Sequence, residues 1–186
     1  VHPILRKLEG RDRRSIGKSN EVVADVAANP TFFRAVFSGL QSDDAVLRAR
    51  AADAIEKITA RHPEYLRHYK TQLIGPLARV SQKEVRWHVA QMLPRVQWKE
   101  SERQRVLGIL MNYLNDTSSI VKTFAMQALA DLAHKNPELI PRVLRHLQEL
   151  TVIGTPAMKA RGRKLLAGLG GLTRRSTRRA TKRRAG

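Results

Sequence analysis

Residues 121–132 read V-K-T-F-A-M-Q-A-L-A-D-L, and this stretch decides the fold because it recurs along the chain. Ungapped copies of it begin at Leu47, Val85 and Met158, so that successive copies start 38, 36 and 37 residues apart. In every copy an apolar first residue is followed by Arg or Lys, the fifth residue is small or β-branched, and the eighth, ninth and twelfth are apolar. Self-similarity at a fixed period of this length indicates a repeat architecture.

The apolar positions of each copy fall in one stripe about 100° wide when residues are placed around a helix axis. Each copy therefore predicts an amphipathic helix, and the expected second helices of the repeats cover residues 44–62, 83–97, 118–135 and 156–168. A further apolar-periodic segment precedes each one, at residues 32–40, 65–77, 106–114 and 139–150. Since one helical pair cannot bury its apolar face alone, we expect an all-α, right-handed α-solenoid of stacked pairs.

The repeats divide the chain into three parts. Residues 30–169 hold four full helical pairs, and residues 1–29 fit a partial, degenerate leading repeat. Residues 170–186 contain seven basic residues and no acidic one, and Leu172 is their single apolar side chain larger than Ala. Such a segment cannot offset the entropy lost on ordering by burying surface. We therefore expect a disordered basic C-terminal tail behind a hinge at Gly170-Gly171.

The third copy carries a family resemblance. Asp116 lies five residues before Val121-Lys122, and an A-x-x-A-L-x-x-L run follows at residues 125–132, which resembles the HEAT-repeat (armadillo-like helical) family. The second copy departs from the pattern because it has lost the Asp and has Ser81 nearby. The resemblance covers roughly residues 30–169 and implies a scaffold or adaptor fold.

The resemblance also implies a role for the basic residue at the second position of each copy. The resemblance implies that these residues form a ladder of contacts between repeats, in which each pairs with the Asp of a turn. We therefore interpret these four residues as structural rather than as a binding site. They are Arg48, Arg86, Lys122 and Lys159.

The second helices of HEAT-like repeats line a concave groove, so the resemblance places a candidate binding site on their exposed positions. Both tryptophans of the chain, Trp87 and Trp98, fall on the groove side of one helix, and exposed Trp often marks recognition. The alternative is that Pro94 bends the helix and tucks Trp98 into the next repeat. The predicted groove residues are Arg50, Trp87, His88, Gln91, Arg95, Trp98, Gln127 and Lys164.

The sequence carries no pattern typical of catalysis or of metal binding. The absence of cysteine excludes a disulfide framework, a thiol nucleophile and a Cys-ligated metal, and the six histidines form no H-x-x-x-H motif. The HEAT-like DNA glycosylases resemble this chain in placing a groove aromatic one helical turn before a catalytic Asp. Here Trp87 is followed one turn later by Gln91, which cannot act as a carboxylate base. We expect no enzyme activity, cofactor, metal or small-molecule substrate.

The charge of the chain leaves two partner classes open. The 35 Lys and Arg residues against 16 Asp and Glu give a net charge of +19. The first hypothesis is a protein partner held along the groove. Asp53, Glu56 and Asp131 are expected to face the groove, and a groove with charges of both signs favours a protein over nucleic acid. The second hypothesis is nucleic acid bound through groove and tail, or more weakly a relative of the DNA-repair glycosylases that lacks the catalytic Asp.

The basic tail and the composition of the chain give expectations about its partners and its cellular location. We expect the tail to contact polyanions without sequence preference, because its charges have no acidic partners of their own. The basic residues involved are Arg174, Arg175, Arg178, Arg179, Lys182, Arg183 and Arg184. The longest uncharged apolar run is too short to cross a bilayer, so no membrane contact is expected. The lack of cysteine favours the cytoplasm, or the nucleus in a eukaryote.

Overall fold

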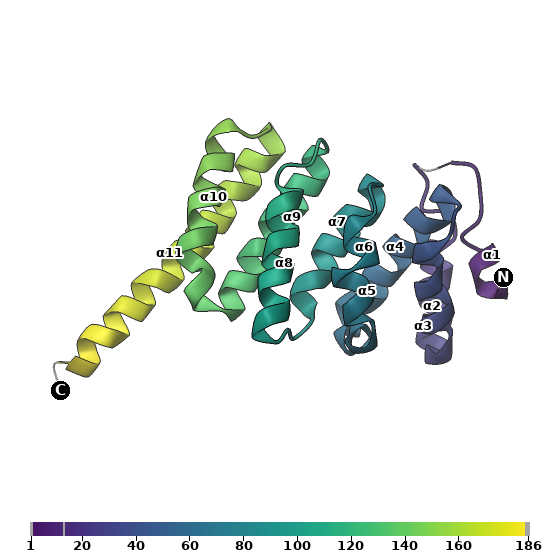
Figure 1. Cartoon of the computed structure of the whole chain (residues 1–186), viewed down its shortest axis with the longest axis horizontal. Helices are drawn as coiled ribbons and strands as arrows, with labels where there is room; N and C mark the ends of the chain where they lie inside the picture. The colour runs from purple at the N-terminus through teal and green to yellow at the C-terminus, as the bar shows by residue number, and fades with distance from the viewer. Residues whose placement is uncertain (1, 13, 185–186) are drawn as a thin grey trace.

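The computed structural model describes residues 2–12 and 14–184, with side chains as far as Gly171, and this described part is helical without any strand. The helices stand side by side in chain order, with the N-terminus at one end of the molecule and the C-terminus at the other (Figure 1). The prediction of an all-α protein is confirmed. The α-helices are α1 Pro3–Arg6, α2 Ser19–Ala28, α3 Phe33–Ser38, α4 Ala45–Arg61, α5 Lys70–Ile74, α6 Pro76–Arg79, α7 Lys83–Met92, α8 Glu100–Tyr113, α9 Ser119–Lys135, α10 Ile140–Ile153 and α11 Pro156–Arg184.

Helices α4, α7, α9 and α11 begin at or within one residue of the starts predicted from the repeat. Local capping explains this precision: the Asp44 carboxylate accepts a hydrogen bond from the Val46 amide at 2.7 Å, and Ser118 caps α9 through the Val121 amide. Helix α7 ends at Met92, earlier than the predicted residue 97, and a short 3-10 helix follows at Leu93–Arg95. Pro94 causes this end, because proline lacks the N–H that would continue the helix.

The helices expected to precede them are more irregular than the sequence predicted. Short 3-10 helices at Pro30–Phe32 and Gly39–Gln41 flank α3, and another at Pro63–Tyr69 leads into α5. Helix α8 starts at Glu100, six residues before the predicted start, because Glu102 accepts a hydrogen bond from the Lys99 amide at 2.9 Å. A 3-10 helix at Pro137–Leu139 precedes α10.

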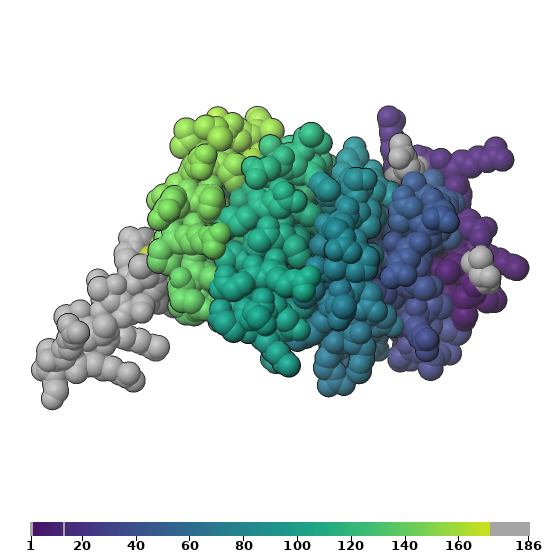
Figure 2. All heavy atoms as spheres, in the orientation of Figure 1, coloured from purple at the N-terminus to yellow at the C-terminus, as the bar shows by residue number. Residues whose placement is uncertain are grey.

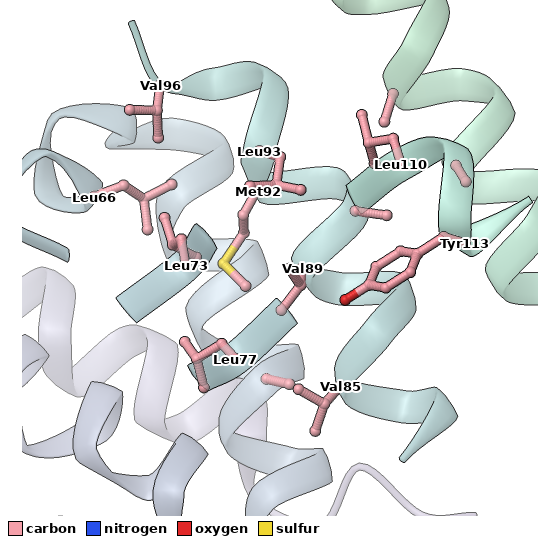
Figure 3. Packing of buried hydrophobic residues seen from close by; sticks show 14 of the residues in the cluster. Leu66, Leu73, Leu77, Val85, Val89, Met92, Leu93, Val96, Leu110 and Tyr113 are labelled. Atoms are coloured by element: carbon pink, nitrogen blue, oxygen red, sulfur yellow. The ribbon is translucent and has the colours of Figure 1, made fainter. Parts of the chain in front are cut away.

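One hydrophobic core runs through the helices. Helix α2 packs on α4, α4 on α7, α7 on α9 and α9 on α11, so the predicted second helices form a continuous layer. Ala51 and Ala125 are fully buried, and these small side chains let neighbouring helices approach closely. Figure 3 shows the middle of this core, where Val89 and Met92 of α7 lie between Leu73 and Tyr113 of the flanking elements. In the space-filling view, consecutive segments form successive bands along the molecule (Figure 2).

Two of the four basic residues at the second position of the sequence copies, Arg86 and Arg48, contact the turn before the next of these helices. Arg86 pairs with Asp116 of the following turn at 2.5 Å, and the Ser118 amide donates to the same carboxylate at 2.7 Å. Burial alone would raise the pKa of Asp116, but the Ser118 amide and the Arg86 guanidinium bring it below its ordinary value. In the preceding repeat Arg48 donates to the Gln82 side chain at 2.9 Å, so Gln82, and not Ser81, replaces the missing Asp.

Helix α11 extends beyond residue 168, where the predicted second helix ends. Its backbone continues through Gly170 and Gly171 to Arg184. A helix that has already nucleated extends at low cost, and the Arg, Lys and Ala residues of this stretch are good helix formers, which outweighs about 1 kcal/mol per glycine. The side chains of the seven predicted polyanion-binding residues lie outside the described part of the structure.

Candidate binding groove

Two hollows lie along the layer formed by α4, α7 and α9. The N-terminal hollow, of about 1290 Å³, is bounded by residues 11–12 and 14–16, by α4, by the start of α7 and by the turn before α9. The C-terminal hollow, of about 440 Å³, is bounded by the end of α7, by α9 and by Arg161 of α11. Helix α7 borders both, so the two hollows together are called the groove below.

Six of the eight predicted groove residues line these hollows. Arg50, Trp87 and His88 line the N-terminal hollow, and Gln91, Arg95 and Gln127 line the C-terminal one. The other two, Trp98 and Lys164, line neither. The groove therefore gathers most of the predicted residues, although several of them are already engaged within the protein.

Arg50 is not free for a partner, contrary to its prediction as a binding residue. Its side chain is only 7% exposed, and its guanidinium donates to four backbone carbonyl groups of the N-terminal segment. The carbonyls of Ser15 and Asp12 lie 3.0 Å from it, and that of Leu8 lies at 3.3 Å. These bonds form because the segment before α2 folds back over α4. Arg50 thus fastens that segment as one wall of the N-terminal hollow.

Trp98, one of the predicted groove residues, borders neither hollow. Because α7 ends before it, its indole Nε1 donates to the Leu93 carbonyl at 2.7 Å and its ring packs against the core. The Lys70 ammonium sits over the ring, 5.2 Å from its centroid. Trp87 is half-buried like Trp98, and its ring also packs against the core, but it borders the N-terminal hollow.

His88 is buried beside the charged groups of α4. Removal from water lowers the pKa of His88 to about 4, against the opposing influence of Asp53 and Glu56, while Lys57 and Arg95 lower it further. The imidazole is therefore neutral at pH 7, and it cannot contribute a positive charge to phosphate binding. Its ring lies against Trp87, with 5.5 Å between centroids.

This buried histidine predicts a pH dependence of stability. The folded pKa of about 4 lies below the ordinary value of 6.5, so the unfolded chain takes up the proton first as the pH falls. The stabilisation is complete above pH 6.5 and decreases as the pH falls toward 4, by about 3 kcal/mol at most. Urea unfolding from pH 7.5 to 4 should give a steeper loss for the native chain than for His88→Gln. Parallel profiles would contradict the burial of a neutral imidazole.

The three acidic residues expected to give the groove mixed sign are all held by partners. Asp53 accepts hydrogen bonds from Ser19 and from Lys57, the latter at 2.7 Å. Glu56 pairs with Arg95, which also donates to the Glu56 carbonyl at 2.7 Å. Asp131 accepts from the Gln127 amide at 2.8 Å. Asp53 and Asp131 line the hollows, whereas Glu56 does not line either hollow and instead neutralises Arg95, which does.

Sequence reasoning missed two parts of the groove. Residues 11–12 and 14–16 form a wall that the repeat pattern could not place, because they precede the periodic segments. The flanking Gly10 and Gly17, both with positive φ, were the available signal. Lys135, at the end of α9, borders the C-terminal hollow and donates to the Pro94 carbonyl at 2.6 Å. Its position depends on how α9 packs on the end of α7, which no local pattern encodes.

Among the described residues, no group of three or more His, Asp and Glu side chains is arranged to hold a metal ion. No described helix combines the length and the apolar character needed to cross a membrane. In comparisons with known proteins, no family model, no curated protein and no solved structure matches this chain.

Proposed function

We propose that this chain is a non-enzymatic, HEAT-like α-solenoid scaffold that holds a segment of a protein partner in its groove. About four full repeats and a partial leading repeat would form the array, and the basic tail would add contacts to polyanions. The observation that carries the proposal is that Arg50, Arg86 and Arg95 are engaged within the protein while Trp87 borders the groove.

The charges of the groove support a protein ligand over a nucleic acid backbone. Arg50 is bound to carbonyl groups, Arg86 is paired with Asp116 and Arg95 is paired with Glu56. A phosphate would have to compete with these internal partners of the three arginines. A half-buried aromatic residue beside polar side chains suits a peptide anchor.

The absence of a catalytic role rests on the pair Trp87 and Gln91. Gln91 sits one turn after Trp87, and its amide donates to the Trp87 carbonyl at 3.3 Å. A neutral amide that is tied to the backbone neither removes a proton nor stabilises a developing cation by charge. This arrangement supports a binding module over a glycosylase.

Nucleic-acid binding is the second candidate function, and the tail is the specific feature that favours it. Seven basic residues occur within residues 174–184, and none of the residues between them is acidic. In this alternative the array positions the tail on a polyanion, and the groove has a secondary role.

The two tryptophans supply a matched test of the groove. Trp87→Ala should weaken partner binding by about 2 kcal/mol or more. It should cost less stability than Trp98→Ala, because among the described residues only the Trp98 indole donates a hydrogen bond. Trp98→Ala should instead lower the free energy of unfolding by about 3 kcal/mol, because its ring is packed and its indole bonded. Thermal melts of both variants, with pull-downs before and after nuclease treatment, measure these effects. A larger loss of stability from Trp87→Ala than from Trp98→Ala would make Trp87 a core residue and remove the proposed anchor.

A further inference from the structure

We infer that the C-terminal hollow is a carboxylate-recognition site that selects an acidic segment of the partner. This inference rests on the proposed function and deepens it by naming the chemistry of the ligand. Three basic residues line the hollow, namely Arg95, Lys135 and Arg161, against the single acidic residue Asp131. Their different hydrogen bonds decide which of the three is available to a ligand.

Arg161, near the start of α11, is held in place without being neutralised. Its Nη1 donates to the Gln127 side-chain oxygen at 2.7 Å, and the Gln127 nitrogen donates to Asp131 at 2.8 Å. Asp131 therefore orients the amide, and the amide orients the guanidinium. Within the described part of the chain, no carboxylate forms an ion pair with Arg161, and its Nε and Nη2 make no hydrogen bond.

The free Nε–Nη2 edge of Arg161 has the geometry that a carboxylate requires. Two parallel N–H donors on one side of a planar guanidinium match the two oxygens of a carboxylate and form a bidentate pair. Because Nη1 is already bound to Gln127, the side chain loses little rotational freedom when the ligand arrives. Lys135 adds a second positive charge, since its Nζ donates to a neutral carbonyl. Arg95 contributes less because Glu56 neutralises it.

The remaining walls indicate a peptide. Phe124, Pro94 and Ala128 give the hollow an apolar side, so an acidic residue next to an apolar one fits it best. Over both hollows, nine basic and five acidic side chains line the groove, an excess of four positive charges. This excess attracts an acidic segment from a distance and raises its rate of association.

The experiment selects ligands without assuming their identity. Random decapeptides displayed on phage are panned against the immobilised full-length chain, and the enriched peptides are made with a fluorescent label. We expect enrichment of Asp and Glu. Fluorescence anisotropy should then show that Arg161→Gln lowers the affinity for an acidic peptide at least about tenfold. A loss of this size is typical when a hydrogen bond to a charged group is removed. Arg161→Lys, which keeps the charge but loses the planar fork, should give an intermediate loss.

Arg163→Gln is the matched control, because Arg163 is exposed on the same helix and does not line the hollow. Its affinity for the peptide should equal that of the native chain. Replacing the acidic residues of the peptide by their amides should lower the binding affinity as much as Arg161→Gln does. The two changes together should lower the affinity little more than either change alone. Additive losses would overturn the pairing. Circular dichroism of each variant verifies that α11 is retained.

The outcomes separate this inference from the proposed function. Enriched peptides that need Trp87 but carry no acidic preference would overturn the carboxylate site and leave the scaffold proposal standing. A panning experiment that enriches no peptide would count against both. If a 20-base-pair duplex displaced the peptide and its own binding were weakened by Arg161→Gln, the hollow would bind phosphate, and the peptide assignment would be wrong.

Discussion

Ala125→Asp is expected to abolish the cooperative folding of this chain. Ala125 is fully buried on α9, the helix that packs against α7 on one side and α11 on the other. A carboxylate at this position would have no partner, and an uncompensated buried charge costs several kcal/mol, a large part of the 5–15 kcal/mol that typically stabilises a domain. Circular dichroism and thermal melting of the purified variant measure the loss.

Ala160→Asp serves as the control for this substitution. Ala160 is exposed near the start of α11, so the same change of side chain there places the new charge in water. The control should melt within a few degrees of the native chain, because surface substitutions change stability by about 0.5 kcal/mol or less. A normal melt for Ala125→Asp as well would show that α9 does not form the centre of the core.

Removal of the tail charges should have the second large effect, on binding to nucleic acid. If all seven basic residues of residues 174–184 contact phosphates, they add roughly −5 to −6 to the slope of log K against log salt. Between 50 and 200 mM salt, this contribution alone corresponds to about a 10³-fold change in affinity. Binding of duplex and single-stranded oligonucleotides across a salt series measures the slope.

Two altered chains isolate this contribution. The truncation 1–169 removes the tail but keeps Leu169, which is fully buried, and a full-length variant with the seven residues changed to Gln keeps the length. Both should bind more weakly than the native chain and with a shallower slope. Equal slopes for all three proteins would show that the tail is not an electrostatic tether. If the native chain did not bind the oligonucleotides at about 0.1 M salt, nucleic-acid binding would be rejected as a function of this chain.

The helices could be predicted from the sequence because their determinants are local. The period of the apolar residues and the capping side chain of Asp44 fix the start of α4 without any knowledge of its neighbours. The end of α7 was missed by several residues although Pro94, its cause, is visible in the sequence. The apolar periodicity of the copy continues past Pro94, and the prediction followed this periodicity although proline cannot continue a helix.

The site was predicted less well, because a helical wheel gives the direction of a side chain but not what covers it. Arg50 and Trp87 both project from second helices, yet a loop from outside the repeats covers the first and leaves the second half-buried. Lys164 is exposed but borders neither hollow. Burial of this kind depends on contacts between distant segments, and a single periodicity carries no information about them.

The fastening of the N-terminal segment has a consequence for how this protein can change during evolution. An added Cβ at Gly17 would lie 2.6 Å from the Arg50 guanidinium, and one at Gly10 would lie closer still. Both glycines also have positive φ, which side chains rarely adopt. A side chain at either glycine position would therefore displace the guanidinium that holds the wall of the groove. Replacing Arg50 would remove this clash, but the positive φ would still favour glycine at both positions.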